Sequence, residues 1–439
     1  MNLEEKECIF SNLSVIGTEM FQLMNDLFPI CRSITGNGVR KSFELIKNYL
    51  DVELFEVASG TKVNDWTIPK EWNITDAYVI DPNGNKIIDF KNSNLHVVNY
   101  SIPVKKKLSL EELKPHLHSI PEQPELIPYK TSYYEEDWGF CLSHNQLLNL
   151  KDGDYEVCID SSLENGALTY GEYFIQGKTD KEIVISCYVC HPSLCNDNLS
   201  GVVITTLLAK ILCNVSCHYS YRFLFIPETI GAITWLHQNK QNLGKIKHGL
   251  VVTCAGDSGS STYKKTRQGN MEIDKTVQNV LRSSGNDYSI DDFFPMGSDE
   301  RQFCSPGYNL PFGSLMRTGY GRYNVYHTSG DNFDFVKQEF LMDTFSKYIS
   351  IFFTLENNRY YKNLNPKGEP QLKKRNLINP INTLLWILNF SDGENSLLDI
   401  SDKSNILFKE IVTAANELVQ SKLLEEIIDD ETRKINTRF

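Results

Sequence analysis

Residues 190–201, CHPSLCNDNLSG, place a histidine and an aspartate in a polar loop between two apolar segments. The segment before it, EIVISCYV (182–189), is almost continuously apolar, and the segment after it, VVITTLLAKIL (202–212), has the length of a helix. A short apolar run, a turn and a longer apolar run are typical of a buried strand followed by the helix that covers it. The stretch therefore predicts a strand–loop–helix unit whose loop carries reactive side chains.

The same pattern recurs downstream of this unit. YRFLFI (221–226) and GLVVT (249–253) are short apolar runs, and helices are expected over 200–213, 230–242 and about 333–361. Strands that are buried on both faces and separated by helices indicate an α/β domain. We expect a mostly parallel mixed sheet flanked by helices.

Two further regions have a different pattern of apolar and polar residues. Residues 61–159 contain short alternating runs and a hairpin, AYVIDPNGNKIIDF (77–90), with Asn-Gly at its tip. Residues 376–439 follow a charged, Pro-containing linker and have the outline of a winged helix, with three short helices and a terminal hairpin. We therefore expect an α/β domain formed by 1–60 and 160–375, an inserted small β-rich domain, and a C-terminal winged-helix domain.

Composition and charge exclude several classes of protein. The chain has 44 Lys and Arg against 56 Asp and Glu, a net charge of −12, which disfavours a general nucleic-acid or anionic-membrane binder. No secretory signal and no apolar run of transmembrane length is recognised. Eleven cysteines, an odd number, are interpreted as reduced thiols. The expected location is the cytoplasm.

Ionisable side chains follow the predicted strands. His191 and Asp197 follow the first strand, Glu228 follows YRFLFI, and Asp257 follows GLVVT. The carboxyl ends of parallel strands meet at one edge of a sheet, where ligands bind. Imidazole and carboxylate groups suit Zn²⁺, and a remaining carboxylate can act as a general base. Further candidates lie in later segments: Asp299, His327 and Asp331.

Each of these residues also has an ordinary structural explanation. The NDN triplet is a common turn or helix cap, and Glu228 could complement a helix dipole. Cys187, Cys190 and Cys195 offer a thiolate zinc site as an alternative, but no second C-x-x-C pair is present, so they are interpreted as buried packing residues. No G-x-S-x-G motif supports a serine nucleophile, and no phosphate-binding glycine motif occurs.

Four segments together resemble the co-catalytic zinc aminopeptidases, whose fold the glutaminyl cyclases share. They are NDNLSG, FLFIPETIG, GSDERQFCSPGYNLP and YHTSGDNFD, in the same order and at similar spacing. The whole chain is further identified as a member of a little-characterised bacterial and archaeal family with an aminopeptidase-like domain, an inserted β-domain and a winged helix. That resemblance rests on CRSITGNGVR, VNDWTIPKEWNI, LHVVNYS, PYKTSYYEEDWGFC, CHPSLCNDNLSG and FPMGSDERQF.

The resemblance implies roles for particular residues. Asp197 takes the place of the metal-bridging aspartate, and His191 and His327 take the places of zinc-binding histidines. Glu228 falls on the general base of the zinc aminopeptidases. Asp299 is a further catalytic candidate, and either Asp299 or Asp331 could hold the α-ammonium of a substrate.

At three positions the chain lacks a carboxylate that the zinc aminopeptidase pattern has at or near its metal ions. Ser193 stands where H-x-D would have its aspartate, Thr229 replaces a carboxylate ligand, and Thr253 occupies the place of an aspartate. Asp257 lies four residues further on and is a weak candidate ligand. One zinc ion, held by His191, Asp197 and His327, is therefore expected rather than two, with Glu228 as the base or as a fourth ligand.

The leading functional hypothesis is a zinc-dependent amide-bond hydrolase, an aminopeptidase that acts on a peptide or a small amide. One alternative keeps the metal in a deacylase or a cyclase of the same fold. The other is a non-catalytic binding or regulatory protein that retains the peptidase shell. Residues 380–439 carry six Lys or Arg and eleven Asp or Glu, so we expect protein contact rather than DNA binding, and a homo-oligomer through the C-terminal or the β-rich domain stays open.

Overall fold

The computed structural model describes residues 1–375 and 377–427. Residues 428–439 of the predicted winged-helix domain lie outside the described part of the chain. The chain divides into two compact units. The larger unit contains Asn12–Gly269 and Asp287–Phe345, and the smaller unit contains Met1–Ser11, Asn270–Asn286 and the chain from Ser346 onward.

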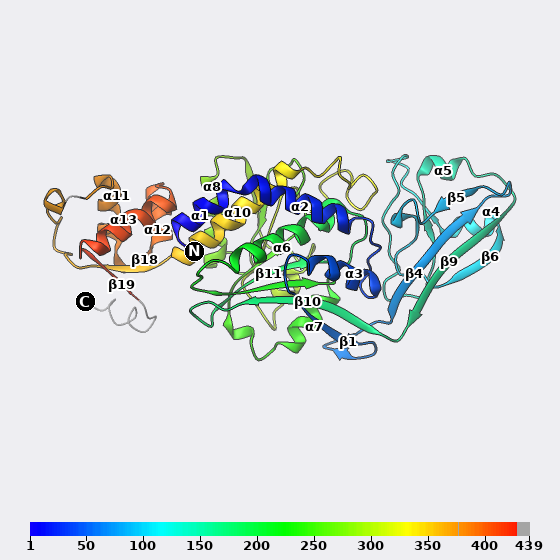
Figure 1. Ribbon diagram of the computed structural model, residues 1–439, viewed down its shortest axis with the longest axis horizontal. Helices are drawn as coiled ribbons and strands as arrows, with labels where there is room; N and C mark the ends of the chain where they lie inside the picture. The colour runs from blue at the N-terminus through cyan, green and yellow to red at the C-terminus, as the bar shows by residue number, and fades with distance from the viewer. Residues whose placement is uncertain (376, 428–439) are drawn as a thin grey trace. The chain divides into compact units, whose positions relative to one another are not determined.

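A mixed eight-stranded sheet forms the centre of the larger unit (Figure 1). Its strand order is β1-β10-β12-β11-β13-β16-β14-β15. The four middle strands are parallel, namely β11 (Glu182–Tyr188), β12 (Ser220–Ile226), β13 (Ile246–Val252) and β16 (Phe312–Met316). The outer strands are β1 (Glu53–Ala58), β10 (Ala167–Ile175), β14 (Ser261–Lys264) and β15 (Tyr288–Asp291). The expected α/β class with a mostly parallel mixed sheet is confirmed.

Helices cover both faces of this sheet. The helices of the larger unit include α2 (Leu13–Leu27), α3 (Asn37–Ile46), α6 (Ser200–Leu212) and α7 (Ile230–Gln238). Successive residues of β10 point to opposite faces of the sheet. A Cβ on Gly171 would meet Phe43 of α3, whereas Glu172 accepts a hydrogen bond from Trp235 of α7, so these two helices cover opposite faces. Every residue of β11 is buried, which explains its continuous apolar run.

The β-rich region builds a separate four-stranded antiparallel sheet in the order β5-β4-β9-β6. Its strands are β4 (Glu71–Ile80), β5 (Lys86–Asp89), β6 (Val104–Ser109) and β9 (Asp154–Glu164). Gly84, with φ of +85°, lies in the turn between β4 and β5, as the Asn-Gly tip predicts. This sheet has its own apolar core, which includes Ala77, Val79, Ile88, Val157 and Ile159. The segment after it, β10, joins the central sheet.

The smaller unit contains the winged-helix elements. The helices α11 (Ile381–Phe390), α12 (Leu397–Ser404) and α13 (Phe408–Gln420) match the three short helices expected. Among the described residues of this region, β18 (Asp392–Ser396) and β19 (Leu424–Glu426) each pair antiparallel with β17 (Tyr360–Asn363) and not with each other. The helix expected over 333–361 is α10, Gln338–Asn357, which spans the division between the two units.

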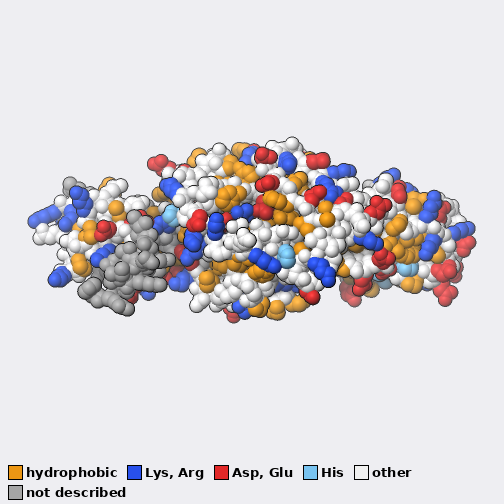
Figure 2. All heavy atoms as spheres, turned by 90° about the horizontal axis from the view of Figure 1, so that it is seen from below, with side chains coloured by type: hydrophobic (Ala, Val, Ile, Leu, Met, Phe, Trp, Pro, Cys, Tyr) orange, Lys and Arg blue, Asp and Glu red, His pale blue; other side chains and the backbone are white. Residues whose placement is uncertain are grey.

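Two further observations concern the helices and one face of the protein. Among the described residues, no helix has the length and apolarity required to cross a lipid bilayer. On the face drawn in Figure 2, basic and acidic side chains are interspersed with apolar ones. The described side chains visible on that face therefore carry charges of both signs.

Candidate functional site

Three of the predicted side chains converge at the carboxyl edge of the central sheet. His191 follows β11, Asp197 lies in the irregular turn Cys195–Leu199 before α6, and His327 lies in the loop after β16. One ligand atom from each of these residues lies within 4.8 Å of the others. We call His191, Asp197 and His327 the ligand cluster.

Unused donor atoms in the ligand cluster fit a cation. His327 Nε2 and Asp197 Oδ2 are 2.8 Å apart and buried, yet neither makes a hydrogen bond of good geometry within the described part of the chain. Buried polar atoms without partners are costly unless another group satisfies them. Two imidazoles and a carboxylate are the donor set that zinc accepts, so the residues present fit this metal.

Asp197 is fixed from several directions. The Tyr188 hydroxyl donates to its Oδ1, and its backbone N–H donates to Asp331 Oδ2 at 3.0 Å. Burial raises the pKa of this carboxyl, but the neighbouring His191 and His327 outweigh burial and lower the pKa to about 2. The side chain is therefore an anion at neutral pH.

His191 is held as a neutral imidazole. Burial lowers its pKa to about 4, although the charge of Asp197 opposes that shift. Arg32, itself buried, donates from Nε to the His191 carbonyl at 3.1 Å and so fixes the backbone at this position. Neutral imidazole is the form that coordinates a metal.

Glu228 and Asp299 form a pair of neighbouring acids beside the ligand cluster. Glu228 Oε2 lies 3.8 Å from His191 Nε2, and the Glu228 side chain is 26% exposed. Burial raises the pKa of Glu228 well above its usual value, and the charges of Asp299 and Asp197 add to the shift. Burial likewise raises the pKa of Asp299 to about 7. We call these two residues the acid pair.

The backbone at Thr229 holds Asp299 in place. Thr229 has φ of +63°, an uncommon conformation for a β-branched residue, and such strain occurs most often at functional sites. Its N–H donates to Asp299 Oδ1 at 2.7 Å, whereas Asp299 Oδ2 is buried without a hydrogen-bond partner among the described residues. One carboxylate oxygen of Asp299 therefore remains available to a ligand.

Two of the predicted residues lie outside the ligand cluster. Asp331 accepts hydrogen bonds from the backbone of Asn196 and Asp197, at 2.6 and 3.0 Å, and burial raises its pKa to about 8. Asp257 accepts hydrogen bonds from the Asn196 side chain and from Thr318. Both residues support the turn that carries Asp197.

The short polar residues at the departures from the aminopeptidase pattern have other partners. The Thr253 hydroxyl lies 2.6 Å from the Tyr188 hydroxyl, and the Ser193 hydroxyl donates to the Phe28 carbonyl at 2.9 Å. Thr229 accepts a hydrogen bond from Arg301 at 3.0 Å. These three hydroxyls therefore belong to the scaffold around the ligand cluster.

Sequence reasoning missed two tyrosines. Tyr188 is the last residue of the apolar strand β11. A buried hydroxyl at that position needs a hydrogen-bond partner, and this could have indicated its contact with Asp197. Tyr129 comes from the β-rich region, and its ring centroid lies 5.2 Å from those of both His191 and His327. Nothing in the local sequence around Tyr129 indicates that this loop returns to the carboxyl edge of the central sheet.

The thiolate alternative gains no support from the geometry. Cys187, Cys190 and Cys195 are fully buried and form no disulfide, and burial raises the pKa of each thiol. The Cys190 sulfur instead lies 3.4 Å from His191 Nδ1 and accepts the Glu228 N–H. These thiols pack behind the ligand cluster.

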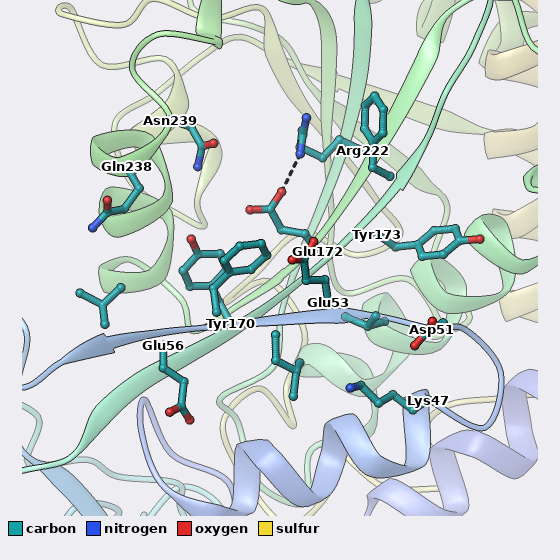
Figure 3. Close-up of a pocket in the computed structure, with 15 residues that line it drawn as sticks. Lys47, Asp51, Glu53, Glu56, Tyr170, Glu172, Tyr173, Arg222, Gln238 and Asn239 are labelled. Carbon is teal, nitrogen blue, oxygen red and sulfur yellow. Dashed lines mark hydrogen bonds and ion pairs between the residues drawn. The ribbon is translucent and has the colours of Figure 1, made fainter.

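A separate hollow of about 1060 Å³ lies over β1 and β10 (Figure 3). The rings of Phe55 and Tyr170 stack there at 5.2 Å, and Arg222 pairs with Glu172 at 2.7 Å. None of the predicted site residues lines this hollow. This hollow is therefore separate from the chemistry at the strand ends.

Comparison with known proteins agrees with this architecture. Residues 21–358 match the model of a family described as a domain of unknown function (DUF4910), and residues 359–426 match a winged helix-turn-helix. A protein of Clostridium acetobutylicum, named as a polysaccharide biosynthesis protein with an aminopeptidase-like domain, is 54% identical over 96% of this chain and 100% of its own length.

Solved structures extend the similarity to the fold. A crystal structure described as a peptidase from Clostridium acetobutylicum, 54% identical, has a TM-score of 0.95 and covers 97% of this chain and 100% of that one. A zinc aminopeptidase from Bacillus subtilis has a TM-score of 0.57 at 12% identity, over 78% of this chain and 95% of that one. The aminopeptidase-like fold and the C-terminal winged helix are thereby confirmed.

Proposed function

The chain belongs to the DUF4910 family, and from that premise we propose that it is a zinc-dependent amide-bond hydrolase, most simply an aminopeptidase. The observation that carries the proposal is the ligand cluster, in which two imidazoles and one carboxylate bring donor atoms within 4.8 Å. Three protein ligands with an open position are typical of catalytic rather than structural zinc sites.

The proposed ligands are His191, Asp197 and His327, and one zinc ion per chain is more economical than two. A bound zinc ion would polarise the substrate carbonyl and lower the pKa of water at the site. Glu228 would accept a proton from the attacking water and pass it to the leaving amine. A cation nearby favours the ionised form of Glu228, which offsets the raised pKa of this carboxyl in the metal-free protein.

Asp299 is the better candidate for holding the α-ammonium of a substrate. Its Oδ2 is buried and has no hydrogen-bond partner among the described residues, whereas both oxygens of Asp331 accept backbone N–H groups. An unpartnered carboxylate oxygen gains most from a charged donor. In this proposal Asp331 and Asp257 keep the Asp197 turn in place.

Alternative substrates and roles follow from two particular observations. The Clostridium acetobutylicum relative is named for polysaccharide biosynthesis, which favours an amide on an amino sugar as the second candidate substrate. Thr229 stands where the zinc aminopeptidases have a carboxylate ligand, and this favours a non-catalytic protein if no turnover is found.

The cysteines suggest a cellular location. The buried thiols Cys187, Cys190 and Cys195 suit a reducing compartment, so we propose the cytoplasm.

Substrate profiling would test the proposal. Zinc-loaded protein is incubated with free-amino dipeptides, their N-acetylated counterparts and N-acetylated amino sugars, and products are identified by mass spectrometry. The proposal predicts release of the first residue from free-amino peptides only, and loss of that activity with a chelator. Cleavage confined to amino sugars would support the second candidate, and no cleavage at all would support the non-catalytic alternative.

A further inference from the structure

A segment of the β-rich region, 127–134, crosses the rim of the candidate site. The Tyr129 N–H donates to the His327 carbonyl at 2.8 Å, and the Ser329 N–H donates to the Ile127 carbonyl at 2.8 Å. Ile127 in turn donates to the Ser329 hydroxyl at 2.9 Å. The loop that carries His327 is therefore bonded directly to this segment.

The other side of the segment is fixed to the β-rich region itself. Asn99 donates from its backbone to the Lys130 carbonyl at 2.8 Å, and the Ser132 N–H donates to the Asn99 carbonyl at 2.9 Å. The Asn99 side chain also donates to the Arg32 carbonyl at 2.8 Å. The segment is thus held from both sides and presents a defined set of side chains.

Those side chains are aromatic. Tyr129 is buried over the two imidazoles, and its hydroxyl lies 2.8 Å from that of Tyr133. Tyr134 follows with φ of +69°, and its ring packs edge-on against Trp66 with 5.2 Å between centroids. Tyr134 is 45% exposed and Trp66 is 36% exposed, so these two rings keep accessible faces.

Ring contacts link Tyr134 to the ligand cluster. The ring centroids of Tyr133 and Tyr134 lie 6.3 Å apart, and the Tyr133 hydroxyl meets that of Tyr129, whose ring packs against both imidazoles of the ligand cluster. Trp66 is in β3 (Trp66–Thr67), and the turn before it donates from the Asn64 N–H to His237 Nδ1 at 3.3 Å. His237 lies in the last turn of α7, at the opposite end of the helix from Thr229.

We propose that Tyr134 and Trp66 form an aromatic subsite that binds the apolar ring of an amine substrate, namely a peptide with an aromatic first residue. Ring faces attract aromatic side chains and also a nearby ammonium group, and a carboxylate oxygen of Asp299 can pair with that ammonium. This inference rests on the proposed function and adds the substrate class.

Binding rather than turnover tests the subsite. We would titrate zinc-loaded protein with L-phenylalanine hydroxamate and L-alanine hydroxamate in a calorimeter. Wild type should prefer the phenylalanine compound by about tenfold or more, a typical gain for filling an apolar pocket. Trp66→Ala and Tyr134→Ala should each reduce the preference to about threefold or less, with alanine hydroxamate affinity and zinc content unchanged.

Three controls make the outcome decisive. Tyr134→Phe should keep the preference, because the ring and not the hydroxyl is required. Tyr288→Ala removes an exposed tyrosine from the edge strand β15 and should change nothing. Equal wild-type binding of both compounds would overturn the subsite alone, whereas zinc-loaded protein that binds neither would overturn the proposed function as well. Tighter binding of N-acetylglucosamine than of phenylalanine hydroxamate, lost in the same variants, would overturn the assignment to an aromatic peptide and give the subsite to a sugar.

Discussion

Asp197 is the residue on which most interactions of the site depend. Its side chain is bonded by Tyr188 and lies against His327, while its backbone is bonded by Asp331. Removing the carboxylate would leave two imidazoles without the anion that faces them. A ligand set of only two neutral donors binds zinc weakly, because three protein ligands are usual even in open sites.

Replacement of a cluster ligand should therefore abolish zinc binding. We expect Asp197→Asn and His327→Gln each to lose stoichiometric zinc, as measured by atomic absorption after dialysis against zinc-containing buffer. His237→Gln is the matched control, because His237 lies on α7 outside the ligand cluster, and it should bind like wild type. Full zinc content in both cluster variants would show that the ligands lie elsewhere.

Glu228→Gln separates a base from a ligand. The amide keeps the size of the side chain and removes its basicity, so zinc content should stay at the wild-type value. Turnover of a free-amino peptide should fall by about 10²–10⁴, the usual contribution of a general base. Loss of zinc from Glu228→Gln would instead identify Glu228 as the fourth ligand, and unchanged turnover would remove it from the chemistry.

The extent to which sequence predicts the site can be judged at these same positions. His191, Asp197 and His327 could be found because strand ends meet at one edge of a parallel sheet. Ser193 and Thr229 were visible as departures from a known pattern. Tyr129, Tyr134 and Trp66 were not found, since their approach to the site depends on the path of a long loop that no local pattern encodes.

At the scale of elements, the site depends on how closely α6 approaches β13. Gly201 lies in the first turn of α6, and a Cβ placed there would come within 2.3 Å of the Val252 carbonyl oxygen and 2.4 Å of the Asn198 side chain. Asn198 itself donates to that carbonyl at 3.0 Å and accepts the Gly201 N–H at 3.2 Å. This contact fixes the turn that carries Asp197.

Gly201→Ala should displace this turn. We expect a loss of about 1–3 kcal/mol in the free energy of unfolding, the usual cost of overpacking a close contact, and weaker zinc binding. Thermal denaturation and zinc titration measure the two effects. Gly244→Ala is the control, because nothing lies within 4 Å of a Cβ at that position. Equal behaviour of the two variants would mean that the close approach is not required.

Element prediction succeeded where the apolar period was unambiguous. The runs of β11 and β12 were found because both faces of these strands are buried. The pairing of β10 with β1 and β12 could not be inferred. A strand of alternating apolar and polar residues has the same sequence pattern whether it belongs to the central sheet or to the sheet of the β-rich region. The pairing of β17 with β18 and β19 joins strands far apart in sequence, which no hairpin signal indicates.

At the scale of the whole molecule, the winged helix raises the question of DNA binding. The matched region, 359–426, contains nine Lys or Arg and nine Asp or Glu, so it is neutral rather than acidic. Within the smaller unit, Lys275 pairs with Asp399 and Arg282 pairs with Asp402. Phosphate binding needs positive charge, and neither the neutral balance of this region nor the net charge of −12 of the chain favours it.

We therefore predict no specific binding of duplex DNA at physiological salt. Fluorescence anisotropy with a pool of random duplexes should give dissociation constants no tighter than the nonspecific range of about 10⁻⁴–10⁻⁶ M. Binding that is tighter by a factor of about 10³ for one sequence would contradict the prediction and assign the winged helix to DNA.

The central claim, that one zinc ion held by the ligand cluster supports amide hydrolysis, is tested most directly by a zinc titration of metal-free protein. Zinc binding and turnover of a free-amino peptide are followed in the same sample as zinc is added. The account predicts that activity rises in proportion to bound zinc and reaches its plateau at about one equivalent per chain. Activity that appears only between the first and the second equivalent, or zinc bound without any turnover, would contradict it.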